Sequence, residues 1–246
     1  MINSLILRLI GDKTAGRLDY FLNRKSKDAW GALNGQTVRQ KAYKDIIGRI
    51  SFRAIVETGT YRGTTSDYFA TTSGLPVYTV EVHPRCYGYS MERFAKDTRV
   101  HAYQGDSPKF LRELAEDTNV PKSNVFFYLD AHVQDSSKYH KAPLLEELEI
   151  IFENWKEAVV MVDDFQVPGS DYGFDDWGSG KTLNVEIIHA LKPFGVTAFF
   201  PSVPAMQDTG AKRGWVVVCR EQRITKILEG IENIKAYSTL ETGVAT

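Results

Sequence analysis

The sequence has few cysteines, no long hydrophobic run and no excess of charge of either sign. Only Cys86 and Cys219 occur among 246 residues, and neither belongs to a Cys-x-x-Cys or Cys/His pattern, which argues against a thiolate zinc site and a disulfide scaffold. Isolated cysteines are typical of reduced thiols, so we expect a cytoplasmic protein. The apolar runs fall far short of the roughly 20 residues of a membrane-spanning helix, so no membrane partner is expected.

The charge balance argues against a general nucleic-acid binder. Thirty basic residues stand against thirty-one acidic ones, for a formal net charge of −1, and a hydrophobic content of 43% is ordinary for a globular chain. The segment 1–10 is apolar but interrupted by Arg8, and it lacks a charged start and a cleavage site of small residues. We therefore expect a short amphipathic helix there rather than a signal peptide, and its apolar side favours a homodimer.

Short apolar runs alternate with helical patterns from about residue 51 onward. The runs are rich in β-branched and aromatic residues, as strands buried on both faces must be. Alternation of this kind predicts βαβ units and a parallel, doubly wound sheet. The predicted strands are 54–56, 77–80, 100–103, 125–129, 158–162, 196–200 and 215–219, and the predicted helices are 38–50, 64–72, 108–116, 143–155 and 183–191.

Acidic residues stand at or just beyond the end of each of the first five predicted strands. The carboxyl ends of parallel strands share one edge of a sheet, and ligands of open α/β sheets bind in the crevice outside that edge. Several carboxylates in one crevice would repel each other unless a ligand or a cation compensates them. The residues are Glu57, Glu81, Asp106, Asp130, Asp163 and Asp164.

Two glycines four residues apart, Gly59 and Gly63, follow the first strand and precede the helix predicted to begin near Thr64. This spacing predicts a tight turn whose backbone can approach a ligand closely. Glu57 precedes the first glycine, and its carboxylate would repel a pyrophosphate, which argues against a dinucleotide fingerprint. The same carboxylate suits a positively charged ligand such as an amino-acid ammonium group.

The acids after the second and third strands have positions that suit a nucleoside. Glu81 lies where an acceptor for ribose hydroxyls is expected, and an ionised carboxylate accepts hydrogen bonds from two adjacent hydroxyls. Asp106 offers a carboxylate to a purine amino group. Asp106 or Ser107 would equally cap the helix predicted from residue 108, and both roles can coexist.

These residues carry a family resemblance. The pattern Glu57-x-Gly59-x-x-x-Gly63, followed by Glu81 and Gly105-Asp106, resembles that of class I S-adenosylmethionine-dependent methyltransferases. The resemblance implies a Rossmann-like α/β fold, with a doubly wound, seven-stranded, mostly parallel sheet, helices on both faces and an antiparallel final hairpin. It implies S-adenosylmethionine as the cofactor, bound by Glu57, Gly59, Thr60, Gly63, Glu81, Asp106, Ser107 and Asp130.

We expect three regions along the chain. Residues 1–50 form an N-terminal helical extension, 51–220 the S-adenosylmethionine-binding methyltransferase domain, and 221–246 a C-terminal helix and tail.

The later strand ends resemble a narrower branch, the metal-dependent O-methyltransferases of the macrocin and novobiocin type. Asp130-Ala-His132 and Asp163-Asp164 carry this resemblance, although Ala131-His132 and the long gap before Asp163 depart from the branch. It implies Mg²⁺ held by Asp130, Asp163 and Asp164, and methylation of a hydroxyl on a small molecule such as a sugar or natural product. A divalent cation eases deprotonation of a coordinated hydroxyl.

Asp130 and His132 are the candidate catalytic residues. His132 suits a general base because its pKa lies near neutrality, but it could equally be a metal ligand or an ordinary loop residue. Aromatic side chains in the long segment 165–180 are candidates for a wall around the acceptor. They are Tyr172, Phe174 and Trp177.

Two other functions fit parts of the pattern. A metal-dependent nucleotide-sugar glycosyltransferase would use Asp130-Ala-His132 at its metal, but it would not need Glu57 and the glycine turn. A methyltransferase-like module without activity would bind the cofactor or a partner only, although the full set of acidic positions argues mildly against it.

Overall fold

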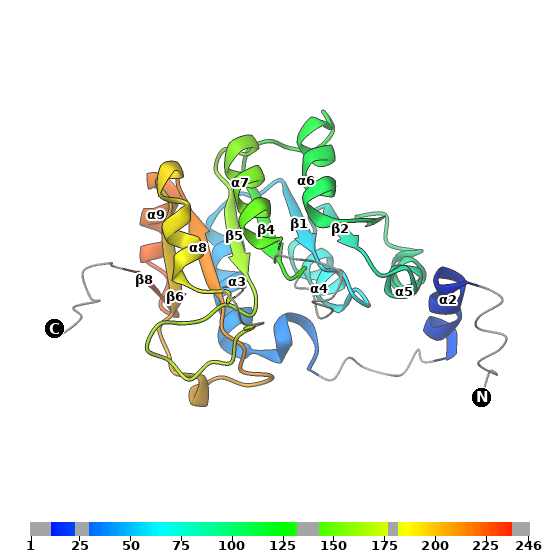
Figure 1. Cartoon of the computed structure of the whole chain (residues 1–246), viewed down its shortest axis with the longest axis horizontal. Coiled ribbons are helices and arrows are strands. Elements are labelled where there is room, and N and C mark those ends of the chain that lie inside the picture. Colours follow the sequence, from blue (N-terminus) through cyan, green and yellow to red (C-terminus); the bar gives the residue numbers. More distant parts are fainter. Residues whose placement is uncertain (1–10, 23–29, 132–142, 177–181, 238–246) are drawn as a thin grey trace.

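The computed structural model describes residues 11–22, 30–131, 143–176 and 182–237. Its centre is one eight-stranded sheet with the strand order β3-β2-β1-β4-β5-β7-β6-β8 (Figure 1). The chain enters at the middle with β1 and winds outward in both directions, so the order reverses between β1 and β4. The strands are β1 (Ala54–Thr58), β2 (Val77–Glu81), β3 (Val100–Gln104), β4 (Val125–Leu129), β5 (Val159–Val162), β6 (Thr197–Pro201), β7 (Val216–Cys219) and β8 (Ile234–Ala236).

Helices cover both faces of the sheet because alternate strand residues are apolar on each side. Phe127 and Leu129 of β4 face a core shared with α6, α7 and α8, whereas Phe126 and Tyr128 face a second core shared with α3, α4 and α9. The predicted α/β fold with helices on both faces is confirmed. The bounds of these helices are α3 (Thr37–Arg49), α4 (Thr64–Ser73), α6 (Ser107–Glu116), α7 (Leu144–Asn154), α8 (Val185–Ala190) and α9 (Gln222–Glu229).

Strands β1 to β5 are parallel, and β7 runs antiparallel to both of its neighbours, β5 and β6. The final antiparallel hairpin of the prediction is therefore present. The predicted number of seven strands is wrong, because β8 pairs antiparallel with β6 as an eighth. This strand is three residues long and only Ile234 is buried, so it carries no alternating pattern that a sequence reading could detect.

Two further helices lie at the β3 end of the molecule, α2 (Asp12–Leu22) and α5 (Pro84–Phe94) (Figure 1). They pack so closely that a Cβ on Gly16 would collide with the Arg85 carbonyl, and one on Gly88 with the Lys13 carbonyl. The helix predicted for residues 1–10 lies outside the described residues. Within the described ranges, none of the helices is long and apolar enough to cross a membrane.

Candidate functional site

The parallel strands bring the predicted acidic residues to one edge of the sheet, which we call the carboxyl edge. Thr58, the last residue of β1, is in register with Leu129 of β4, and Leu129 with Val162 of β5. Asp130 and Asp163 therefore leave neighbouring strands at the same level. On the other side of β1, the last residue of β2 is Glu81.

The glycine turn after β1 is held by the sheet itself. The backbone N–H groups of Gly59 and Thr60 both donate to the Val80 carbonyl at 3.1 Å. Gly59 has φ +88°, and a Cβ there would collide with the carbonyl of Asp130. Gly63, at φ +79°, is the N-cap of α4 and leaves room for the ring of Phe94. Close packing within the chain therefore requires glycine at both positions of this turn.

Glu57 is buried beneath this turn, where its carboxylate ties three elements together. Ser66 of α4 donates to Oε2, and Thr79 of β2 donates to the same oxygen at 2.6 Å. The hydroxyl of Thr79 also lies 2.6 Å from that of Thr60. Burial raises the pKa of Glu57 to about 7, although the Ser66 and Thr79 hydroxyls oppose the rise.

Glu81 ends β2 at the carboxyl edge, where the sequence predicts an acceptor for ribose hydroxyls. Its two oxygens accept from the backbone N–H groups of Tyr61 and His83, at 2.6 and 2.7 Å. A carboxylate can accept about four hydrogen bonds, so Glu81 keeps capacity for a ribose hydroxyl. The predicted cofactor residue therefore fits the group in position and in donor–acceptor chemistry. Burial raises the pKa of Glu81, and the His83 and Tyr61 amides oppose that rise.

Asp106 lies next to Glu81 across the ends of β2 and β3, since the N–H of Gly105 donates to the Glu81 carbonyl at 3.1 Å. Asp106 is exposed and caps α6 by accepting from the Lys109 N–H at 3.3 Å, and Ser107 is buried. The capping role that the sequence offers for Asp106 is the one that these contacts establish.

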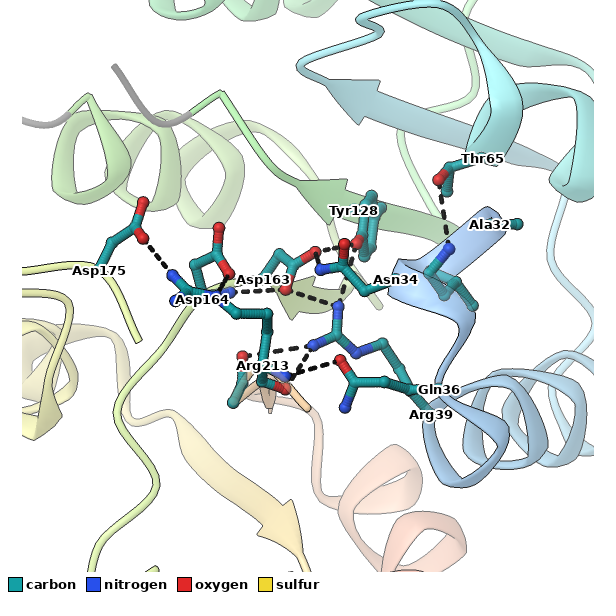
Figure 2. Close-up of polar contacts among 12 residues, drawn as sticks. Ala32, Asn34, Gln36, Arg39, Thr65, Tyr128, Asp163, Asp164, Asp175 and Arg213 are labelled. Carbon is teal, nitrogen blue, oxygen red and sulfur yellow. Dashed lines mark hydrogen bonds and ion pairs between the residues drawn. The ribbon is translucent and has the colours of Figure 1, made fainter. Parts of the chain in front are cut away.

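Asp163 is fully buried at the end of β5, where four donors of this chain surround its carboxylate (Figure 2). Arg39 Nη1 lies 2.5 Å from Oδ1, which also accepts from the Asp164 N–H at 2.6 Å. Tyr128 Oη and Asn34 Nδ2 donate to Oδ2 at 2.5 and 2.9 Å. Burial alone would raise the pKa of Asp163, but the Arg39 guanidinium and these donors hold it below its ordinary value.

Asp164 forms an ion pair with a second arginine, Arg213. Arg213, which precedes β7, donates through Nε to Asp164 and through Nη2 to Asp175 (Figure 2). Burial and the Asp163 carboxylate raise the pKa of Asp164 to about 7, against the opposing charge of Arg213. Asp164 also has a left-handed φ of +52°, a conformation that costs free energy in a non-glycine residue.

Asp130 is the remaining acid of the predicted magnesium site. Burial, followed by the charges of Asp163 and Asp164, raises its pKa well above the ordinary value. Its predicted companion His132 lies outside the described residues.

The described residues do not fit a magnesium site. Nowhere in the described ranges do three or more His, Cys, Asp or Glu side chains form a group that could hold a metal ion. Asp163 is surrounded by donors rather than by space for a cation, and Asp164 is paired with Arg213. The expected roles of these two residues as metal ligands therefore have no support in the geometry.

Sequence reasoning missed three residues that shape this edge: Arg39, Asn34 and Arg213. Arg39 had a detectable signal, because it shares one face of its helix with Tyr43 and Ile46 at spacings of four and seven residues. An arginine within an apolar helical face needs a buried partner. Asn34 and Arg213 lie in irregular segments with no such pattern.

Glu147 of α7 is another buried acid that the sequence analysis did not identify. It is 0% exposed, and neither carboxylate oxygen has a hydrogen-bond partner in the described part of the chain. Burial raises its pKa to about 7, although the nearby hydroxyls of Ser107 and Thr58 oppose the rise.

The predicted aromatic wall is only partly where the sequence suggests. Tyr172 is buried and donates to Asp208 at 3.2 Å, so it belongs to the core rather than to an open wall. Phe174 is half-buried, and Trp177 lies outside the described residues.

Solved methyltransferase structures share this fold. The O-methyltransferase from Bacillus cereus in complex with SAH is 17% identical, with a TM-score of 0.54, over 87% of this chain and 93% of that one. The O-methyltransferase TomG from Streptomyces achromogenes, in complex with SAM, is 18% identical, with a TM-score of 0.52, over 84% and 89%. No protein-family model and no curated protein matches the sequence. The fold of this chain is therefore the Rossmann-like fold of such methyltransferases.

Proposed function

We propose that this protein is an S-adenosylmethionine-dependent methyltransferase that methylates a hydroxyl group of a small molecule. The observation that supports it most is the placement of Glu81 and Asp106 at the ends of adjacent strands, beside the turn at Gly59. This arrangement offers acceptors for ribose hydroxyls and an adenine amino group at the point where open α/β sheets bind ligands. The fold shared with the two O-methyltransferases supports the same choice.

The proposed cofactor contacts extend along the carboxyl edge. Glu57 stabilises the turn through Ser66 and Thr79 rather than by direct exposure to the ligand. The proposed cofactor-binding residues are Gly59, Thr60, Gly63, Glu81, Asp106, Ser107 and Asp130, and Glu57 supports them from within the chain.

The reaction is a displacement at the methyl carbon. The acceptor oxygen forms a bond to this carbon while the carbon–sulfur bond breaks, and the electron pair of that bond stays on sulfur to give neutral S-adenosylhomocysteine. The hydroxyl proton passes to a base, for which Asp130 and His132 are our candidates. The protein's main contributions are orientation and proton removal, because the leaving group needs no acid. Since Asp163 and Asp164 are paired with arginines, no step is assigned to magnesium.

We also propose an acceptor class, a location and an oligomeric state for this protein. The nearly balanced charge favours a small-molecule acceptor over a nucleic acid. A cytoplasmic location and a homodimer are proposed from the isolated cysteines and the apolar segment 1–10.

Calorimetric titration with S-adenosylhomocysteine tests the proposal. Saturable binding is expected, and its absence would overturn the cofactor assignment. A parallel titration with UDP-glucose and Mn²⁺ separates the alternatives, because binding in that arm alone would favour a glycosyltransferase. Cofactor binding with no methyl transfer to any compound in a panel of sugars and other hydroxyl compounds would indicate an inactive module.

Glu81→Ala should weaken S-adenosylhomocysteine binding by about 1–3 kcal/mol, the range for a lost charged hydrogen-bond partner. Glu116→Ala is the matched control, because Glu116 is an exposed acid at the far end of α6. Calorimetry on both variants gives the comparison. Equal affinities in the two variants would remove Glu81 from the site.

A further inference from the structure

The carboxylate of Asp163 has no acceptor capacity left for a metal ion. An ionised carboxylate offers about four lone-pair sites. Oδ1 accepts from Arg39 and from the Asp164 N–H, and Oδ2 accepts from Tyr128 and Asn34, all within 2.9 Å. A cation could ligate Asp163 only by displacing one of these donors.

The Arg39 guanidinium occupies the position beside Asp163 Oδ1 that a bound cation would need. Its side chain is fully buried, and its Nη2 donates to the Arg213 carbonyl at 2.7 Å while Nη1 pairs with Asp163. Nη1 also lies 3.3 Å from Tyr128 Oη, so the guanidinium is fixed on two sides (Figure 2). A guanidinium is not deprotonated in proteins, so this positive charge is permanent.

The segment that carries Arg39 is itself anchored to the carboxyl edge. Gln36 donates to buried Asp208 at 3.0 Å and accepts from the Arg213 N–H at 3.1 Å. The Ala211 N–H donates to the carbonyl of Asn34 at 3.0 Å. These contacts place residues 34–39 against the loop before β7, so that Arg39 reaches Asp163 from outside the sheet.

We propose that the Arg39 guanidinium takes the place of a divalent cation at the end of β5, so that Asp163 and Asp164 work without metal. Arg39 neutralises Asp163, and Arg213 does the same for Asp164. Both arginines are positioning residues that set the geometry of the β5 end. This inference rests on the proposed methyltransferase function, but its test does not depend on activity.

The test is a titration of the full-length protein with Mn²⁺, in the presence of S-adenosylhomocysteine, following free Mn²⁺ by electron paramagnetic resonance. The wild-type protein should leave the free-ion signal unchanged. Stoichiometric binding of Mn²⁺ by the wild type, reversed by excess Mg²⁺, would overturn the proposal. Calorimetry with S-adenosylhomocysteine alone decides the proposed function separately, so the two failures are distinguishable.

Arg39→Met should create a cation site at Asp163, because it removes the main charge that compensates this buried carboxylate and frees an acceptor position on Oδ1. We expect one Mn²⁺ to bind this variant and none to bind Arg39→Lys, which keeps a positive charge. Arg99→Met is the matched control, since Arg99 pairs with Asp97 at 2.6 Å away from the carboxyl edge. Loss of both Arg39 and Asp163, in Arg39→Met with Asp163→Asn, should abolish the new binding.

Arg39→Met could fail to bind metal simply because it unfolds, so melting temperatures provide a second measurement. They are taken for Arg39→Met, Asp163→Asn and the double variant. If the two residues act as a pair, the double variant should melt no lower than the worse of the two single variants. Melting temperatures that fall additively would contradict the pairing on which the proposal stands.

Discussion

Burial and neighbouring charge together set the pKa values of individual carboxyl groups in this protein. Glu57 and Glu147 are both buried, and the pKa of each is raised to about 7. Asp163 is equally buried but keeps a lowered pKa, because Arg39 supplies a charge at 2.5 Å. Neighbouring charge, rather than depth alone, separates the acid with a lowered pKa from the two acids whose pKa is raised.

Glu147→Gln should flatten the pH dependence of stability. The folded-state pKa of about 7 exceeds the ordinary 4.5, so the native state holds this proton longer than the unfolded state does. Stability from this group is present below pH 4.5 and is lost as the pH rises through 7. Glutamine carries no such titration, so the variant should gain up to about 3 kcal/mol relative to wild type above pH 7.

Urea unfolding followed by circular dichroism across this pH range measures the effect. Glu146→Gln is the control, because Glu146 precedes Glu147 on α7, is half exposed and pairs with Arg112 of α6. A Glu147→Gln variant that loses stability with pH as steeply as wild type would show that Glu147 does not carry the proton.

At the scale of elements, the turn between β1 and α4 joins three strand ends. It hydrogen-bonds to β2 through Val80 and touches β4 at Asp130, so its geometry fixes the relation between Glu81 and Asp130. Glycine is required at position 59 both by φ and by the approach of the β4 backbone.

Gly59→Ala should therefore destabilise the protein by about 2–5 kcal/mol, through left-handed strain and overpacking together. It should also weaken S-adenosylhomocysteine binding, because the turn moves away from β4. Gly74→Ala isolates the strain, since Gly74 ends α4 at φ +70° with nothing near its Cβ position. That control should lose about 1–2 kcal/mol and keep its affinity. Equal losses in the two variants, by urea unfolding and calorimetry, would refute the role of the close approach.

At the scale of the whole molecule, two hydrophobic cores share one sheet. Trp155 packs against Phe127 on the side of α6 and α7, and Trp215 lies in the core with α3 and α4. Both cores include strand residues of this one sheet, so loss of the sheet removes both together. Thermal unfolding should accordingly be a single transition.

Variants that keep only Trp155 or only Trp215, with the other three tryptophans changed to phenylalanine, report on the two cores separately. Within each variant, the midpoint from tryptophan fluorescence should agree with that from circular dichroism to within about 2 °C. If the fluorescence midpoint of one core lies well below the circular-dichroism midpoint of the same variant, that core unfolds independently.

Most of the fold was predictable from local patterns. The strand from Val125 to Leu129 has the predicted bounds, and helix α3 begins and ends within one residue of the predicted 38–50. A buried strand and an amphipathic helix can be detected from a short stretch of sequence, because their periodicity is a local property. The sequence did not predict β8, because three residues at a sheet edge are too few to show an alternating hydrophobic pattern.

The sequence by itself determined that acidic residues end successive strands, since each lies at or just beyond the end of an apolar run. Only the tertiary structure decided what faces them. Asp163 meets Arg39 from a helix far away in the sequence, where the family resemblance implied a metal ion. The physical reason is that burial of a charge demands a partner, while the identity of the partner depends on which distant segments the packing brings together.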